Sequence, residues 1–166
     1  VHGDPHIMPL YSDRRRQANG HNIINDLSTL IHYTGYVCDE SMPKHKKKNN
    51  IIYVSTGLNK EEGLLLFKYL LKIAKDFNNY TFIMLVANRY LSTKTKQKDN
   101  VIIADYIPDL RNKLVDCAAY ITYGGYNATV EILKSRIPSI IIPRQDGQKM
   151  EQFVRAYTFE PYNFFK

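Results

Sequence analysis

The segment from Tyr123 to Glu131, with the sequence YGGYNATVE, combines residue types that could bind a phosphate and a diol. The run 119–123 is β-prone and the apolar residues after Asn127 have helical spacing, so the segment predicts a strand, a glycine turn and a helix. Such a turn presents backbone N–H groups and the positive end of a helix dipole, which favour an anion. We expect Asn127 to be the N-cap of this helix.

Glu131 lies about one turn inside the predicted helix. Helical side chains lean toward the N-terminus, so the carboxylate would point back to the mouth of the turn. A carboxylate beside a phosphate suits the hydroxyls of a ribose, as the acidic residue does in dinucleotide folds. In the alternative interpretation, Gly124 and Gly125 only let helix and strand pack closely and Glu131 is a solvated helix residue. The spacing alone is compatible with both.

The elements around this segment alternate between strand and helix from residue 51 onward. Apolar runs that predict strands occupy residues 51–57, 81–87, 101–104, 119–123 and 138–143. Helical patterns follow near residue 59, over about 109–118, near 127 and from 150. The alternation predicts an α/β fold with a doubly wound, mostly parallel, Rossmann-like sheet whose ligand lies at the carboxyl ends of the strands. That edge would hold Gly57, Tyr106, Gly124, Gly125 and Arg144.

Composition narrows the class of protein. A length of 166 residues suits one domain, or one domain with a piece of another. The composition, 44% hydrophobic and 23% charged, is ordinary for a globular protein. The net charge is +7, but the lysines of 44–48 and 94–98 lie among polar residues typical of solvated loops, so we expect no nucleic-acid partner. Cysteine and histidine spacing predicts no metal site, and no apolar run reaches transmembrane length. Because the first residue is Val, we expect a fragment of a longer protein.

Several segments in order resemble the C-terminal half of GT-B glycosyltransferases. The similar branch is the lipid-intermediate N-acetylglucosaminyltransferase of peptidoglycan synthesis and its predicted bacterial relatives. The resemblance covers about residues 51–160 and rests on the double glycine with Asn127, Thr129 and Glu131, then Ile137-Pro138, an aliphatic strand ending at Pro143, and Glu151-Gln152 with Arg155-Ala156. It implies that residues 1–36 are the tail of a truncated N-terminal domain, 37–50 a linker, and 51–166 a nucleotide-sugar-binding domain.

The resemblance also implies roles for individual residues. The Gly124–Gly125 turn and its helix, with Asn127 and Thr129, would hold the donor diphosphate, and Glu131 the ribose hydroxyls. The backbone of Tyr106 and Ile107 would hold the base. Glu151 and Gln152 match the acid or amide pair near the donor sugar, and Arg144, by our own extension, would add charge near the leaving diphosphate.

The implied reaction moves a hexosyl group from a nucleotide diphosphate sugar, most readily a UDP-sugar, to an acceptor hydroxyl, with no cofactor. Helix termini would stabilise the charge on the leaving group. The general base would come from the missing N-terminal domain, so no catalytic residue is assigned and the chain alone is expected to be inactive. Two departures from the family pattern stand out: only Ser55-Thr56-Gly57-Leu58 follows the first strand, where a glycine-rich loop is common, and Tyr123 precedes the double glycine.

Two further functions stay open at this point. One is a partner-dependent nucleotide-sugar-binding subunit, and the other is a nucleotide-sugar hydrolase in which water replaces the acceptor. Two free thiols, Cys38 and Cys117, indicate a reducing compartment, so we expect a cytoplasmic protein. If the acceptor is a lipid, the basic linker would contact the anionic inner face of the membrane.

Overall fold

The structure is a computed structural model that describes residues 48–55, 60–86, 99–143 and 151–162, together with Gly35 and Val37. The chain divides into two units, Val1–Glu40 and Ser41–Lys166, and all helices and strands described below belong to the second. Predictions for Gly57, for Arg144 and for the lysines at 44–47 and 94–98 lie outside the described residues. The proposed boundaries at residues 36 and 50 stay a prediction.

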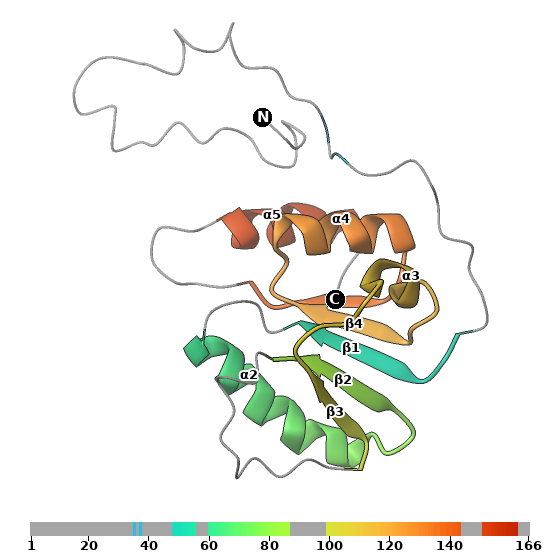
Figure 1. The fold of residues 1–166 in the computed structure, drawn as a ribbon. Coiled ribbons are helices and arrows are strands. Elements are labelled where there is room, and N and C mark those ends of the chain that lie inside the picture. The colour runs from blue at the N-terminus through green and yellow to red at the C-terminus, as the bar shows by residue number, and fades with distance from the viewer. Residues whose placement is uncertain are drawn as a thin grey trace, which may run out of the picture. The chain divides into compact units, whose positions relative to one another are not determined.

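The second unit contains a five-stranded parallel sheet with the strand order β3-β2-β1-β4-β5 (Figure 1). The sequence supports these strands because they consist largely of β-branched and aromatic residues. This sheet, with its flanking helices, confirms the predicted α/β, doubly wound Rossmann-like fold. The bounds are β1 Ile51–Ser55, β2 Thr81–Leu85, β3 Val101–Ala104, β4 Ala119–Thr122 and β5 Ser139–Ile141.

Helices follow β1, β3, β4 and β5, as predicted. Their bounds are α2 Lys60–Ile73, continued by η3 Ala74–Asp76, α3 Leu110–Leu114, α4 Tyr126–Ser135, and α5 Glu151–Phe159, continued by η5 Glu160–Tyr162. The expected helix over 109–118 is shorter than predicted, because the residues after α3 bond to the start of β1 instead. The carbonyl of Asp116 accepts from the N–H of Asn49 at 2.8 Å, and the N–H of Ala118 donates to the carbonyl of Ile51 at 2.8 Å.

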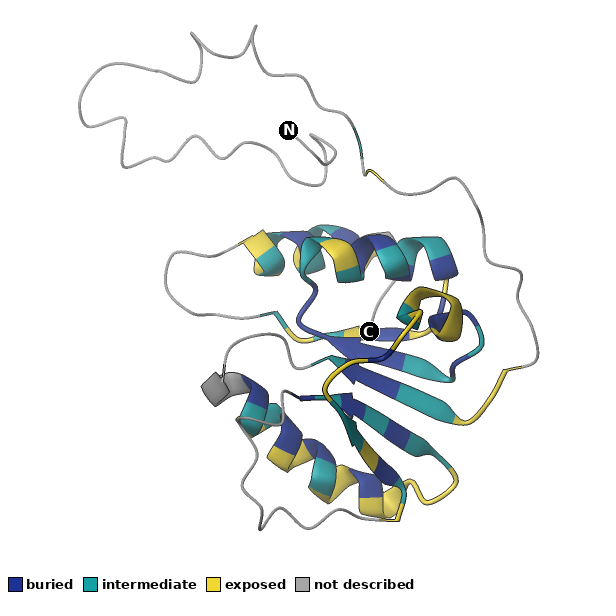
Figure 2. Ribbon diagram, viewed as in Figure 1, coloured by how far each residue is buried: buried dark blue, intermediate teal, exposed yellow. Residues whose placement is uncertain are grey.

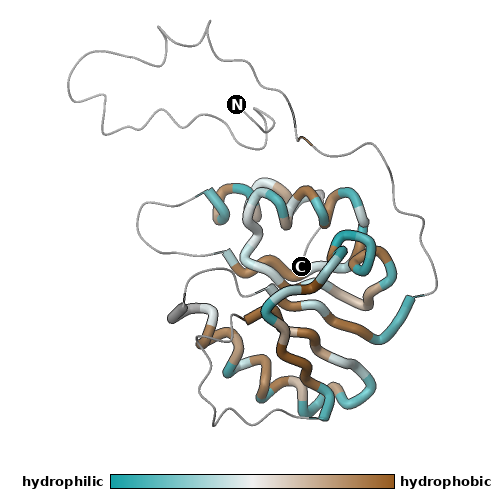
Figure 3. Tube along the Cα trace, viewed as in Figure 1, coloured by the Kyte–Doolittle hydropathy of each residue, from teal (hydrophilic) through white to brown (hydrophobic). Residues whose placement is uncertain are grey.

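Two hydrophobic cores lie on opposite faces of the sheet, since successive side chains of a strand point to opposite faces. Phe67 of α2 packs with Val54 and Ile121 on one face. Tyr53 and Tyr120, the neighbours of those strand residues, belong to the other core, which includes residues of α3 and α4. Figure 2 shows buried and half-buried residues mixed along the strands, and Figure 3 shows the strands largely hydrophobic, whereas α3 is mostly hydrophilic.

Helix α2 leaves part of its face of the sheet open. A groove of about 740 Å³ lies there between α2 and the side chains of β4 and β5. Its lining is apolar and includes exposed side chains, with Leu65 and Tyr69 on α2 and Ile140 on β5. We name this feature the α2 groove. It lies on the face opposite to α3 and α4, because Ile121 and Phe82 line it and both belong to the core under α2.

The strand order places the expected ligand site between β1 and β4. From β1 the chain moves outward through β2 to β3, then returns to β4 on the other side of β1. Ligands of such sheets bind at this switch point, at the carboxyl ends of the strands. Helices α2, α4 and α5 follow β1, β4 and β5, so all three begin at this edge (Figure 1).

Candidate functional site

The two glycines after β4 differ in what requires them. Gly124 has φ +70, and a Cβ there would lie 2.6 Å from Cγ2 of Ile141 on β5. Gly125 has φ −59 and ψ 163, values open to any residue, and a Cβ there would meet no atom of the described residues within 4 Å. Close packing of helix and strand therefore explains Gly124 but leaves Gly125 without a structural reason.

Helix α4 begins two residues earlier than an N-cap at Asn127 predicts. Gly125 is its N-cap, and among the described residues no side chain caps it. The prediction that Asn127 is the N-cap is wrong, because the extended backbone of Gly125 already ends the turn and Asn127 is helical. Asn127 is exposed at the second position of the helix. The first N–H groups of a helix have no acceptor inside it, so α4 presents donors to the carboxyl edge of the sheet.

Thr129 supports the glycine turn from inside the protein. Its side chain is 0% exposed, and its hydroxyl donates to the carbonyls of Gly124 at 3.3 Å and Gly125 at 3.1 Å. The sequence resemblance grouped Thr129 with the donor contacts. In the structure its hydroxyl hydrogen bonds to the two carbonyls of the turn, and its side chain lies beneath the surface of the edge.

Arg155 of α5 holds the same turn from a second direction. It is 2% exposed, and its Nη1 donates to the carbonyl of Gly124 at 2.9 Å. Its Nη2 forms an ion pair with Glu151, one turn earlier on the helix. The spacing of Glu151 and Arg155 predicts such a pair, but nothing in the sequence indicates the bond to Gly124. Sequence reasoning therefore singles out Arg155 without assigning it a contact.

Glu131 lies half-buried on the side of α4 that faces α3. Burial raises the pKa of its carboxyl, while the positive charge of Arg111 on α3 lowers it. Helices α3 and α4 contact each other, in agreement with this interaction. A carboxylate in this position is partly dehydrated, which does not fit the alternative of a fully solvated helix residue.

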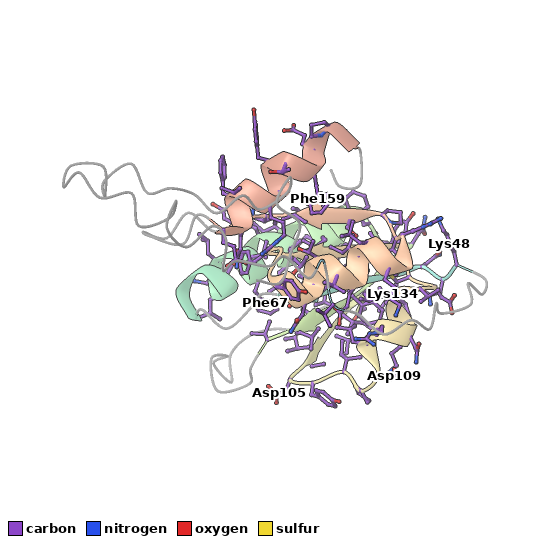
Figure 4. All side chains as sticks on the ribbon, turned by 90° about the horizontal axis from the view of Figure 1, so that it is seen from above. Lys48, Phe67, Asp105, Asp109, Lys134 and Phe159 are labelled. Carbon is purple, nitrogen blue, oxygen red and sulfur yellow. The ribbon has the colours of Figure 1, made fainter. Side chains whose placement is uncertain are left out.

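The residues expected near the base lie on the segment between β3 and α3. The side chain of Tyr106 is 75% exposed, whereas Ile107 is 8% exposed and packs in the core with Leu114. Figure 4 shows this segment between the labelled residues Asp105 and Asp109. Ile107 belongs to the same core as Ile132 of α4, so this segment lies on the face of the sheet that α4 covers.

A polar cluster that the sequence alone does not reveal lies at the switch point. The pKa of the Tyr120 hydroxyl is raised, mainly by burial and also by the negative charge of Glu131. Hydrogen bonds with Thr122 and Ser55 act in the opposite direction. Ser55 and Thr122 are paired residues at the ends of β1 and β4. A signal for the cluster exists in the sequence, since both strands end in a hydroxyl residue, but only the strand order makes them neighbours.

Glu151 and Gln152 open α5 at the same edge. The side chain of Glu151 is 58% exposed, and Gln152 is half-buried. Across the edge the structure thus brings together, in order, the Tyr106 segment, Glu131, the glycine turn and the start of α5. Within the described ranges, no three His, Cys, Asp or Glu side chains are grouped so that they could hold a metal ion. None of the helices described is long and apolar enough to cross a membrane.

No protein-family model matches the chain. Among curated proteins, it is 27% identical over 144 residues to the putative UDP-glucuronosyltransferase ugt-46 of Caenorhabditis elegans, covering 75% of this chain and 26% of that protein. It is also 27% identical over 104 residues to the uncharacterized UDP-glucosyltransferase YdhE of Bacillus subtilis strain 168, covering 63% of this chain and 26% of that protein. The chain therefore spans about a quarter of the length of these relatives.

Solved structures show the same fold. The glycosyltransferase of kitacinnamycin matches 81% of this chain over 35% of its own, with a TM-score of 0.61 and 15% identity. The glycosyltransferase VinC, solved in complex with dTDP, matches 72% of this chain over 29% of its own, with a TM-score of 0.53 and 18% identity. The chain is thus similar in sequence to UDP-sugar transferases, and its sheet and helices have the fold of part of a GT-B glycosyltransferase.

Proposed function

We propose that this chain is the donor-binding part of a glycosyltransferase that moves a hexosyl group from a UDP-sugar to an acceptor hydroxyl. The observation that carries the proposal is the order of chemical groups along the carboxyl edge. An exposed aromatic ring comes first, then a half-buried carboxylate, then the N-terminus of α4, then a carboxylate and an amide at the start of α5. A nucleotide sugar carries base, ribose, diphosphate and sugar in that order.

The diphosphate suits the start of α4. The helix dipole and the first N–H groups favour an anion. Gly125 has no β-carbon, and among the described residues no atom lies within 4 Å of where a β-carbon would be. Backbone can approach a phosphate closely only where no side chain intervenes, which gives Gly125 the reason that packing does not supply.

The ribose suits Glu131, which lies inside the first two turns of the same helix. A carboxylate accepts hydrogen bonds from both hydroxyls of a diol. Its partial burial disfavours the charged form in the free protein, and two hydroxyl donors would restore the lost hydration. We assign the base to Tyr106 and Ile107. The exposed ring of Tyr106 can stack on a base, and buried Ile107 offers only its backbone.

The named relatives support glycosyl transfer. Because the chain spans only about a quarter of their length, residues outside this chain are expected to complete the active site. We propose that a further domain or a partner supplies the acceptor site and the general base. We further propose that the protein works in the cytoplasm and that its acceptor lies at an anionic membrane. We also propose that it is related to the peptidoglycan branch named above. Flotation with phosphatidylglycerol vesicles at low salt and at about 0.5 M salt tests the membrane contact. Raising the salt from about 0.03 M to about 0.5 M shortens the electrostatic screening length about fourfold.

Isothermal titration with UDP, UDP-glucose, UDP-N-acetylglucosamine, GDP and dTDP tests the proposal. We expect uridine compounds to bind in preference to the others. Glu131→Gln should weaken UDP binding by about tenfold or more, since it removes a charged hydrogen-bond acceptor. Glu160→Gln is the matched control, because Glu160 is exposed in η5. Equal binding of all five compounds, or none by the full chain, would contradict the proposal.

A further inference from the structure

We propose that Arg155 is a positioning residue that acts through a peptide bond: it holds the carbonyl of Gly124 inward so that the N–H of Gly125 faces the donor phosphate. The inference rests on the proposed function above and names a residue that determines the phosphate site without touching the phosphate.

The first step concerns the carbonyl of Gly124. It accepts hydrogen bonds from Thr129 Oγ1 at 3.3 Å and from Arg155 Nη1 at 2.9 Å. Arg155 is the closer donor, and Thr129 shares its single hydroxyl hydrogen between this carbonyl and that of Gly125. Thr129 is 0% exposed and Arg155 is 2% exposed, so both donors lie inside the protein. The carbonyl of Gly124 is therefore turned toward the interior.

The second step concerns the N–H on the same peptide unit. The bond between Gly124 and Gly125 is trans, and in a trans peptide the N–H points opposite to the carbonyl. The N–H of Gly125 consequently points away from Thr129 and Arg155. In the part of the chain that the structure describes, no atom accepts a hydrogen bond from it. A Cβ built on Gly125 would meet no atom of the described residues within 4 Å, so no side chain among them crowds this glycine.

The third step concerns why an arginine stands here. One guanidinium bonds both Gly124 and Glu151, so the glycine turn and the start of α5 are held by the same group. Only the fork of Arg can reach two acceptors in fixed directions. Its Nε is buried without a hydrogen-bond partner among the described residues. Burying such a group is costly, which favours a positioning role over a role in stability.

Comparing UDP with uridine isolates the phosphate contribution. Arg155→Met and Thr129→Val each remove one donor to the Gly124 carbonyl, and Arg155→Lys keeps the charge without the fork. We expect each to weaken UDP binding by about tenfold or more and to leave the affinity for uridine, followed by NMR titration, unchanged. Arg136→Met is the matched control, because Arg136 is exposed at the other end of α4.

A second measurement needs no ligand. ¹⁵N relaxation should report a lower order parameter for Gly124 and Gly125 in Arg155→Met than in the parent chain, while residues within α4 keep their values. Equal loss of UDP and uridine affinity would mean a general structural role and would overturn the inference, as would parent-like UDP affinity in folded variants. If the parent chain binds UDP no better than uridine, the phosphate site itself fails, which refutes the proposed function as well.

Discussion

Alanine substitution at the two adjacent glycines should separate stability from binding. For Gly124→Ala, the left-handed backbone with φ +70 costs roughly 1–2 kcal/mol. The new methyl group would lie 2.6 Å from Cγ2 of Ile141, and relief of this overlap costs about 1–3 kcal/mol more. The expected loss in free energy of unfolding is therefore roughly 2–5 kcal/mol, the sum of these two costs.

Gly125→Ala should leave stability nearly unchanged. Its φ of −59 and ψ of 163 suit alanine, and its methyl group would meet no atom of the described residues within 4 Å. Restricting the unfolded chain stabilises by about 0.4–1 kcal/mol, but alanine is a poorer N-cap than glycine by up to about 1 kcal/mol, so the free energy of unfolding should stay within about 1 kcal/mol of the parent value. The methyl group would nevertheless occupy the space in which we place the donor phosphate, so UDP affinity should fall by about tenfold or more.

Urea unfolding followed by circular dichroism gives the stabilities, and isothermal titration with UDP gives the affinities. The double variant Gly124→Ala with Ile141→Ala separates the two costs at Gly124, because it removes the overlap but keeps the backbone strain. The double variant should lose less stability than the sum of the single variants. Equal destabilisation by both glycine substitutions, or parent-like UDP binding by Gly125→Ala, would refute the reasoning.

Other side chains of the second unit give further predictions. Glu131→Gln should reduce the preference for UDP over 2′-deoxy-UDP, because the preference depends on hydrogen bonds from the ribose to a carboxylate; titration of both ligands with both proteins checks this. Burial raises the pKa of Glu131 above its ordinary value of 4.5, so the folded state binds this proton more tightly than the unfolded state. The parent chain should thus lose stability, relative to Glu131→Gln, as pH rises from 4.5 through the raised pKa, in urea titrations at several pH values. Burial also raises the pKa of Cys117 to about 11, so Ellman's reagent should modify this thiol only at the rate of unfolding. Asn100→Ala should lower the free energy of unfolding by about 1–3 kcal/mol, because its amide donates to the carbonyls of Ala74, Phe77 and Tyr80; a parent-like urea midpoint would contradict this.

The layered fold could be predicted because its evidence is local. Apolar runs long enough for strands alternate with helical patterns, and each strand can be recognised without knowing its neighbours. Strand order was not accessible, since pairing partners lie far apart in sequence. The neighbourhood of Ser55, Tyr120 and Thr122 depends on β1 lying beside β4, so this cluster could not be found beforehand.

Only the local part of the candidate site could be predicted from the sequence. Gly124, Gly125 and Glu131 form a continuous segment whose turn and helix follow from residue type. The N-cap was misplaced by two residues, because the choice between Gly125 and Asn127 depends on backbone dihedral angles that side-chain preference does not fix. Arg155 reaches Gly124 across the fold, and a contact of that range leaves no signature in the spacing of residues.

The α2 groove has a consequence for handling the protein in water. Its lining exposes Leu65, Tyr69 and Ile140 together, and apolar surface gathered in one hollow lowers free energy whenever two copies or an amphiphile cover it. Solubility should therefore decline as the solution is warmed toward room temperature, where apolar association strengthens. A mild nonionic detergent should keep the chain dispersed at concentrations where buffer alone does not.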